Sequence, residues 1–313
     1  MENVLGIKPA FSFSCDNSAP KTLYYSHMTI SQLHDTVYIG YPQIKSILAF
    51  DLRGNYLYSI KINIPQFIIG KFCPMPENVL VICNAMPSAS IYLITTDGVV
   101  ITKFPTPLNH RIIDCISSEK YNIFYILTFH SGYSFGKEGM LKLDTIFVTN
   151  FVRRRLKAIS IIDDDMNMII RYRQDGTLYI YNTRDDVLQP LPIKILSFSK
   201  VFVFDGYVIC PYISRHRNKI AICQFCPHNS SNVSYVMDIG KYDTIHSKLS
   251  AKTSIIHVSS RKLYLGNREN NITVYNLDDL LEKYHRMQNE ISKDTHLYQE
   301  EVDDDSNYYD LFV

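Results

Sequence analysis

The sequence contains no tryptophan, and only 12 glycines and 13 prolines occur among its 313 residues. These low glycine and proline counts exclude collagen-like and low-complexity chains. The charge is nearly balanced, with 32 Lys and Arg against 31 Asp and Glu, so the protein has no overall field to attract a phosphate backbone. No apolar run reaches about 18 residues, so no membrane-spanning helix is expected. The N-terminus also lacks the basic and then apolar pattern of a secretory signal.

Hydrophobic residues make up 46% of the chain and charged residues 20%, a composition that can bury a sizeable core. The seven cysteines are an odd number and are scattered along the sequence. This distribution favours reduced thiols over a disulfide framework. We therefore expect an intracellular protein, cytoplasmic or nuclear.

A repeat of short apolar strands is the main pattern in the sequence. Each unit has a leading strand, expected at residues 29–33, 68–72, 111–116, 156–162, 200–204 and 253–258. The second strands are expected at 36–40, 78–83, 121–129, 167–171, 207–211 and 262–266. The third strands are expected at 46–51, 90–94, 139–143, 176–182, 218–225 and 271–276. Fourth strands are expected at 56–62, 99–104, 145–151 and 233–239.

The second strands begin 42, 43, 46, 40 and 55 residues apart, a spacing typical of the blades of a β-propeller. Third strands such as residues 46–51 are apolar at consecutive positions, as expected where both faces of a sheet are covered. Helical periodicity is nearly absent before residue 278, which argues against α/β folds. The fold class predicted is all-β, a six-bladed β-propeller over residues 1–277, with seven blades as the alternative.

The last unit lacks a fourth strand, and an apolar segment at residues 10–14 lies outside the repeats. We expect this N-terminal segment to complete blade six as its outer strand, because closure by both termini removes an open sheet edge.

Two turns resemble those of known propellers. Residues 51–55 contain Asp-Leu-Arg-Gly-Asn and residues 96–98 contain Thr-Asp-Gly, where glycine and asparagine supply positive φ at little cost. With the surrounding segment ILAFDLRGNYLYSIKI, they resemble blades of NHL-type and quinoprotein-like propellers. The resemblance implies an architecture and no particular activity. The chain departs from WD40 blades, because it has neither their Trp-Asp ending nor a Gly-His pair before any unit.

The chain changes character after residue 277. Residues 278–292 are expected to form an amphipathic helix whose apolar stripe consists of Leu280, Tyr284, Met287 and Ile291. This stripe must be buried either on the flank of the propeller or on a partner. Residues 293–313 form an acidic tail that is expected to be disordered. Its apolar and aromatic end, made of Tyr308, Tyr309, Leu311 and Phe312, is a candidate docking segment for another protein.

Three patterns in the sequence are candidate sites of chemistry. Residues 132–136 match the G-x-S-x-G nucleophile elbow around Ser134, but no helix is expected after them, so a loop between strands is the better interpretation. Cys223, Cys226 and His228 have the spacing of zinc ligands without the second pair that zinc requires, so they are only weak metal candidates. Polar residues near strand ends suit either calcium ligands or ordinary turns, namely Asp35, Asp114, Asp163, Asp205 and Asn267.

The sequence therefore predicts a protein-interaction scaffold without catalytic residues, cofactor or metal, and a subunit of an intracellular multiprotein complex. Its partners are expected to be other protein subunits, bound in part through the C-terminal helix and tail. Two alternatives stay open. One is a metal-dependent, lactonase-like hydrolase on a six-bladed propeller. The other is a nucleic-acid-binding module that uses the basic runs at residues 153–157 and 215–219.

Overall fold

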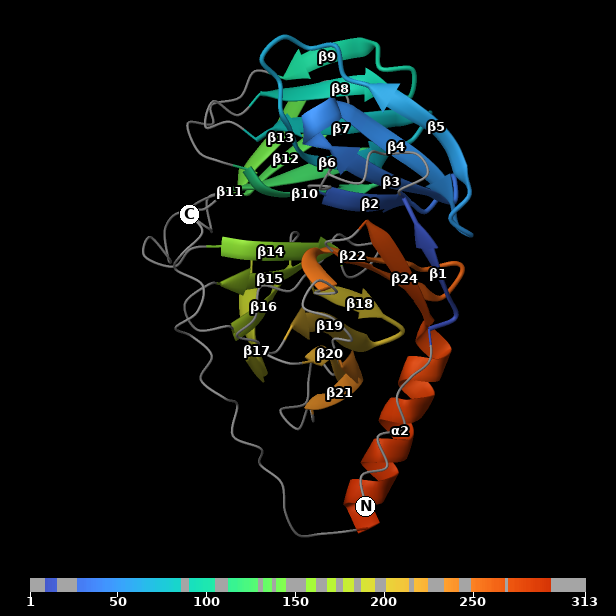
Figure 1. Cartoon of the computed structure of the whole chain (residues 1–313). Helices are drawn as coiled ribbons and strands as arrows, with labels where there is room; N and C mark the ends of the chain where they lie inside the picture. The colour runs from blue at the N-terminus through green and yellow to red at the C-terminus, as the bar shows by residue number, and fades with distance from the viewer. Residues whose placement is uncertain are drawn as a thin grey trace, which may run out of the picture.

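A computed structural model describes residues 9–15, 27–85, 90–104, 112–128, 132–136, 139–144, 156–161, 168–172, 177–182, 187–194, 201–213, 217–224, 234–241, 249–267 and 270–293. The described strands form six four-stranded antiparallel sheets, and one α-helix follows them (Figure 1). We number the sheets one to six in chain order.

Sheets one to three come from the first half of the chain. Sheet one consists of β2 (His27–Ser31), β3 (Thr36–Tyr41), β4 (Ser46–Asp51) and β5 (Tyr56–Lys61), with a short 3-10 turn at Pro42–Ile44. Sheet two consists of β6 (Ile69–Met75), β7 (Val79–Asn84), β8 (Ile91–Thr95) and β9 (Val100–Phe104). Sheet three consists of β10 (Ile112–Ser118), β11 (Ile123–Thr128), β12 (Gly132–Gly136) and β13 (Gly139–Asp144).

Sheets four to six come from the second half. Sheet four consists of β14 (Leu156–Ile161), β15 (Met168–Tyr172), β16 (Thr177–Asn182) and β17 (Val187–Lys194). Sheet five consists of β18 (Phe202–Phe204), β19 (Tyr207–Ile213), β20 (Arg217–Gln224) and β21 (Ser234–Lys241). Sheet six consists of β22 (Leu249–His257), β23 (Lys262–Asn267), β24 (Asn271–Asn276) and β1 (Phe11–Ser14).

The first strands of the sheets lie next to one another around a centre. β2 contacts β6, β6 contacts β10, β10 contacts β14, and β14 contacts β18. β22 contacts both β19 of sheet five and β2 of sheet one, so the last sheet returns to the first. This arrangement of radial sheets, each with its leading strand innermost, is a β-propeller, as the repeat predicted.

The core lies between neighbouring sheets rather than inside any one of them. On β4, Ile47 and Ala49 pack toward sheet two, whereas Leu48 and Phe50 pack toward sheet six and β1. Successive side chains of a strand point to opposite faces, so both faces of this strand are buried. The consecutive apolar residues seen in the sequence are explained by this two-sided packing.

The N-terminal strand β1 pairs antiparallel with β24, with Phe11 opposite Val274 and Ser14 opposite Asn271. The Phe13 ring lies 5.8 Å from the ring of Phe50 in sheet one. It also covers Gly54, where an added Cβ would lie 2.2 Å from Phe13 Cγ. Gly54 has φ of 87°, so this turn requires glycine both for its backbone and for the contact with β1.

The strand assignment of sheet three differs from the sequence prediction. Residues 132–136 form the third strand β12, and β13 at Gly139–Asp144 is the fourth, not the third. The prediction was wrong because glycine and serine in this segment suggested a loop. Tyr133 and Phe135 instead alternate with them and are buried, and the Phe135 ring stacks on Phe124 at 5.0 Å. The predicted fourth strand at 145–151 lies outside the described residues.

Helix α2 (Leu277–Lys293) follows β24 directly, and its first half packs beside sheets five and six (Figure 1). Two acidic residues, Asp278 and Asp279, lie in its first turn, where carboxylates interact favourably with the positive end of the helix dipole. In the part of the chain that the structure describes, no helix is both long and apolar enough to cross a membrane.

Candidate functional site

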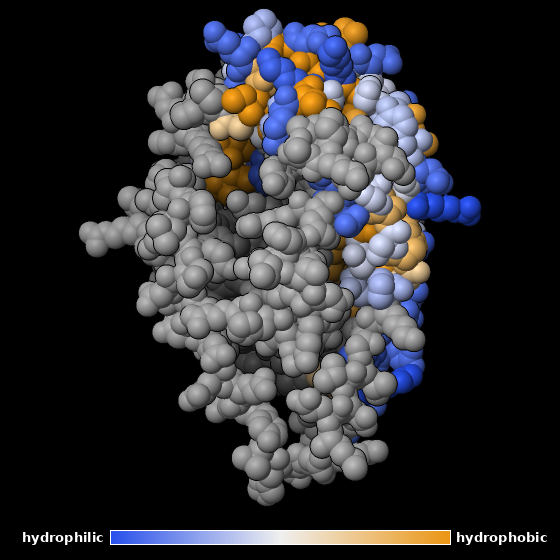
Figure 2. All heavy atoms as spheres, viewed as in Figure 1, coloured by the Kyte–Doolittle hydropathy of each residue, from blue (hydrophilic) through white to orange (hydrophobic). Residues whose placement is uncertain are grey.

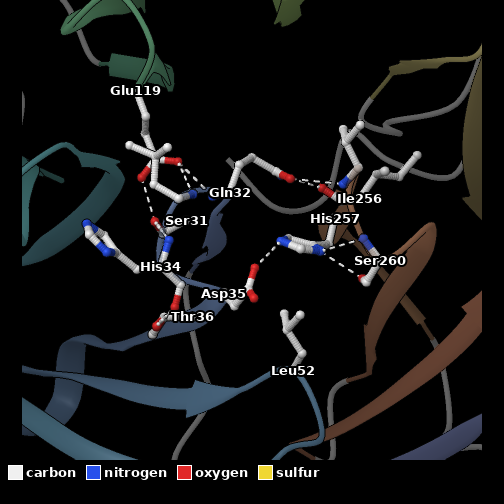
Figure 3. A network of polar contacts seen from close by, with 12 residues as sticks. Ser31, Gln32, His34, Asp35, Thr36, Leu52, Glu119, Ile256, His257 and Ser260 are labelled. Carbon is white, nitrogen blue, oxygen red and sulfur yellow. Dashed lines mark hydrogen bonds and ion pairs between the residues drawn. The ribbon is translucent and has the colours of Figure 1, made fainter.

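The turns between the first and second strands carry a polar network that joins distant parts of the ring. Figure 3 shows the β2–β3 turn at its centre, with the β10–β11 turn of sheet three and the β22–β23 turn of sheet six beside it. We call the surface formed by these three turns the turn face. It consists of residues 31–36, 119–122 and 257–261.

Glu119, at the start of the β10–β11 turn, holds the β2–β3 turn across sheet two. Its Oε1 accepts a 2.5 Å hydrogen bond from the Ser31 hydroxyl. Its Oε2 accepts the backbone N–H groups of Gln32 at 2.7 Å and Leu33 at 3.2 Å. The side chain is 9% exposed, so the carboxylate is largely removed from water and its acceptor sites are used inside the protein (Figure 3). Hydrogen bonds to an ionised acceptor are stronger than neutral ones, and here they fix one turn.

Gln32 joins the same turn to sheet six. Its Nε2 donates to the Ile256 carbonyl at 3.0 Å, and its Oε1 accepts the Val258 N–H at 2.9 Å. The side-chain amide of Gln32 therefore donates one hydrogen bond and accepts another at the end of strand β22, as the backbone of a paired strand does. Together with Glu119, it connects sheets one, three and six at one end of the ring.

His257 lies between Asp35 and Ser260 and is 1% exposed (Figure 3). Its Nδ1 accepts the Ser260 N–H at 3.1 Å and lies 2.7 Å from Ser260 Oγ, while its Nε2 lies 3.1 Å from Asp35 Oδ1. Since Nδ1 is an acceptor, the neutral ring carries its proton on Nε2, toward Asp35. Burial lowers the pKa of His257, against the opposing effect of Asp35.

Asp35, His257 and Ser260 are the residue types of a catalytic triad, but their geometry indicates a hydrogen-bonded turn. In a triad the imidazole nitrogen that faces serine keeps its lone pair for the serine proton. Here Nδ1 already accepts the backbone N–H of the same serine, three residues along the chain. This local hydrogen bond closes the β22–β23 turn, which is a structural role.

Arg261 connects the turn face to sheet five and to helix α2. Its guanidinium forms ion pairs with Asp205 in the β18–β19 turn and with Asp278 in the first turn of α2, each at 2.7 Å. It also lies over the Phe204 ring, 4.7 Å from the centroid. The hydrogen bond with Asp278 is the main reason that the pKa of Arg261 is raised. One residue therefore anchors the start of the helix.

Exposed apolar side chains surround this network. Leu33, Tyr121 and Val258 are 57%, 41% and 53% exposed, and each belongs to a different turn of the turn face. Leu33 donates its backbone N–H to Glu119, and Val258 donates its N–H to Gln32. The turn face thus carries exposed apolar side chains on turns whose backbone is fixed by hydrogen bonds to the side chains of Glu119 and Gln32.

Several predicted site residues pack within the protein itself. Leu280 and Tyr284 are fully buried against sheets five and six, in a cluster with Phe204 and Ile209, and Met287 packs beside it. Leu280 and Tyr284 therefore pack on the flank of the propeller. The side chain of Ile291 is not among those described, and Tyr308, Tyr309, Leu311 and Phe312 lie outside the described residues.

The patterns considered for chemistry have ordinary structural settings. Ser134 lies inside strand β12 and is buried, so the strand-to-helix turn of a nucleophile elbow is absent there. Asp35 and Asp205 adopt φ of 49° and 47°, as expected of turn formers. Buried Asp114 accepts the N–H of Cys115.

Metal ligation finds no support in the described part of the chain. Its His, Cys, Asp and Glu residues include no group of three that could hold a metal ion. Cys223 belongs to β20 with an undescribed side chain, whereas Cys226 and His228 lie outside the described residues. The same holds for Asp163 and for the side chain of Asn267.

Sequence reasoning missed Glu119, Gln32 and His257. Each follows or ends a leading strand, which was a visible signal, but their partners are far away in the chain. Glu119 and Ser31 are 88 positions apart, and Gln32 and Val258 are 226 apart. Only the closed order of the sheets brings them together.

No known protein family and no curated protein sequence matches the chain. Many solved structures resemble it, among them three that cover most of its length. A chain of the mitotic checkpoint complex is 11% identical, with a TM-score of 0.59, over 87% of this chain and 96% of that one. The β-propeller domain of Cps50 (Swd1) from Myceliophteria thermophila is 8% identical, with a TM-score of 0.58, over 86% and 99%. Hydrazine synthase from Kuenenia stuttgartiensis is 12% identical, with a TM-score of 0.56, over 86% and 81%.

At such low identities these similarities show the fold alone. The protein is an all-β propeller with one C-terminal helix among its described residues. The same architecture occurs in a subunit of a complex and in a protein named as an enzyme, so fold does not decide function. The function has to be argued from the turn face.

Proposed function

We propose that this protein is a non-catalytic interaction scaffold, a subunit of an intracellular multiprotein complex, built on a ring of six blades with β1 as the outer strand of the last. The observation that carries the proposal is the turn face, where Leu33, Tyr121 and Val258 are exposed on turns fixed by Glu119 and Gln32. A binding surface of this kind loses little conformational entropy when a partner docks.

Two further features support this proposal over catalysis. Three titratable groups of the turn face are engaged in structural contacts: Glu119 with three donors, His257 with Ser260, and Arg261 with two carboxylates. Exposed apolar side chains close to rigid polar contacts are typical of the centre and rim of protein interfaces. The resemblance to a subunit of the mitotic checkpoint complex is consistent with a role in an assembly.

An intracellular location is part of the proposal. The four cysteines whose side chains the structure describes are buried and free of disulfide bonds, namely Cys15, Cys73, Cys83 and Cys115. Reduced thiols of this kind are the normal state in the cytosol and nucleus.

The test compares partners recovered by the native protein with those recovered by a turn-face variant. Leu33→Ser combined with Val258→Ser removes two exposed apolar groups but leaves the backbone N–H donors in place. We expect the variant to keep its melting temperature and to lose at least one protein that co-purifies with the native chain, identified by mass spectrometry. Leu57→Ser on β5, at a similarly exposed apolar position, is the matched control. If the double variant recovers every partner at native yield, the turn face is not the binding surface.

The C-terminal tail remains a second proposed contact with partners. Residues 293–313 combine acidic side chains with Tyr308, Tyr309, Leu311 and Phe312, a pattern suited to a groove rimmed by Lys and Arg. Deleting residues 294–313 should leave the melting temperature unchanged and weaken recovery of a partner. Unchanged recovery would remove the tail from the proposal without affecting the turn face.

A further inference from the structure

Three buried cysteines meet between sheets two and three. Cys73 lies on β6 and Cys115 on β10, the adjacent inner strands of the two sheets, and their Sγ atoms are 3.0 Å apart. Cys115 also shares a hydrogen bond with Cys83 of β7. All three side chains are 2% exposed or less and belong to one apolar core cluster. Two thiols are thus in direct contact across the boundary between two sheets.

Clustered thiols have two common roles in proteins, metal ligation and disulfide formation. In the described part of the chain, no three His, Cys, Asp or Glu side chains are grouped so that they could hold a metal ion. The distance favours the second role for Cys73 and Cys115, because a disulfide bond is about 2.05 Å long and the two sulfurs need to approach by only about 1 Å. The hydroxyl of Ser117 donates to the Pro74 carbonyl beside them, so the two inner strands are already held together here.

We propose that Cys73 and Cys115 form a reversible disulfide that cross-links and stabilises sheets two and three under oxidising conditions. With hydrogen peroxide as the oxidant, the thiolate of one cysteine attacks a peroxide oxygen and the O–O bond breaks. A sulfenic acid forms, and the leaving hydroxide takes the proton that the thiol had lost. The second sulfur then displaces the hydroxyl group of the sulfenic acid, which leaves as water with the second thiol proton. Both sulfurs are oxidised, and the peroxide is reduced to two water molecules.

Burial determines how fast this reaction occurs. Figure 2 shows hydrophobic side chains among hydrophilic ones at the top of the molecule, where Figure 1 places the outer strands β8 and β9 of sheet two. Cys73 lies on β6, at the other end of the strand order of that sheet. Burial raises the pKa of the Cys73 and Cys115 thiols, so little thiolate is present and the peroxide has to enter between the sheets before it reacts. We therefore expect slow formation of the disulfide, and slow reduction in the folded protein.

The cross-link has a consequence for stability. Cys73 and Cys115 are 42 positions apart in the chain. A disulfide across such a loop removes conformational freedom from the unfolded chain, and the effect grows with the length of the loop. The melting temperature of the oxidised protein should therefore exceed that of the reduced protein by at least about 5 °C.

The test exposes the reduced native protein to dilute hydrogen peroxide and blocks the remaining thiols with N-ethylmaleimide. Peptides are then mapped by mass spectrometry without reduction, and melting temperatures are measured by circular dichroism. We expect one main cross-link, which joins the peptides of Cys73 and Cys115 with the loss of two hydrogens. Dithiothreitol added to the unfolded chain should remove it, and the refolded protein should melt at the reduced value.

Four variants identify the thiols that are needed. Cys73→Ala and Cys115→Ala should each abolish the cross-link and the rise in melting temperature. Cys15→Ala is the matched control, because it removes a buried thiol from the core between sheets one and six, and it should leave both effects in place. Cys83→Ala should leave them in place as well.

Three results overturn the inference. The first is a native protein in which peroxide leaves Cys73 and Cys115 unlinked. The second is a main cross-link between Cys83 and Cys115, and the third is an oxidised protein that melts no higher than the reduced one. The turn-face proposal is unaffected by these results, since it uses other residues.

Discussion

Removing the Glu119 carboxylate should loosen the turn face without disturbing the cores between the sheets. Glu119→Ala deletes the acceptor of one hydroxyl and two backbone N–H groups in the β2–β3 turn. Glu119→Gln keeps the shape and one acceptor oxygen, and its new amide N–H can donate to the Ser31 oxygen. The two substitutions therefore separate the loss of the hydrogen bonds from the loss of charge.

The expected size follows from the number and kind of contacts. A hydrogen bond to a charged group contributes about 1.5–3 kcal/mol, and a buried donor left without an acceptor costs about 1–3 kcal/mol. The Gln32 and Leu33 donors are part-buried, so water recovers some of this loss. We expect Glu119→Ala to lower the free energy of unfolding by about 3 kcal/mol, and Glu119→Gln by about 1 kcal/mol. For a chain of this length, 1 kcal/mol corresponds to roughly 2 °C in melting temperature.

Thermal melts monitored by circular dichroism would measure these shifts, and hydrogen exchange would locate them. The amides of Gln32 and Leu33 should lose protection in Glu119→Ala and largely keep it in Glu119→Gln. Glu282→Ala is the matched control, because that carboxylate lies on the surface of α2 and pairs only with Arg286 among the contacts described. Such an exposed pair contributes about 0.5 kcal/mol or less. If Glu119→Ala melts within about 1 °C of the native protein, the network does not hold the face as argued.

Three further outcomes are expected. Gly54→Ala should lower the melting temperature, because its Cβ would overlap the Phe13 ring and its backbone has positive φ; Phe13→Ala in the same chain should relieve the steric part of this loss. Burial lowers the pKa of His257 in the folded protein, so on acidification the unfolded chain binds a proton at this residue before the folded protein does. The contribution of His257 to the free energy of unfolding is therefore complete above about pH 6.5 and declines below it. Urea melts of His257→Gln should therefore show a weaker loss of stability in acid than the native protein. Burial also raises the thiol pKa values of Cys73 and Cys115, so alkylation mapped by mass spectrometry should reach them only after unfolding.

The sheets were predictable because their strands carry a local signal. Successive apolar residues in β4 and the turn at Gly54 are consequences of two-sided packing and of a tight hairpin, and both can be recognised in one short segment. The strand β12 was missed because its signal, Tyr133 and Phe135 between glycines and serine, is also the composition of a loop. Its burial against Phe124 decides the structure, and that contact depends on the neighbouring strand.

The turn face was not predictable for a different reason. Glu119 and Gln32 look like ordinary polar turn residues, and their roles arise from partners at the ends of other inner strands. Helix α2 is an intermediate case: its apolar stripe was visible, but the sequence could not tell the propeller flank from a partner. The packing of Leu280 and Tyr284 against Phe204 is a tertiary contact, and the spacing of apolar residues along the helix does not predict it.

The pairing of β1 with β24 has a consequence for how the protein is made. Residues 11–14 leave the ribosome long before their partner strand, which ends at residue 276, so the pair cannot form until the residues between them have been synthesised. At about 5–20 residues per second, this delay is about 13 to 52 s. Throughout that time Phe11 and Phe13 have no strand to join, while the sheets after them can fold in turn. During synthesis β1 is therefore an unpaired apolar segment, of the kind that chaperones protect from aggregation.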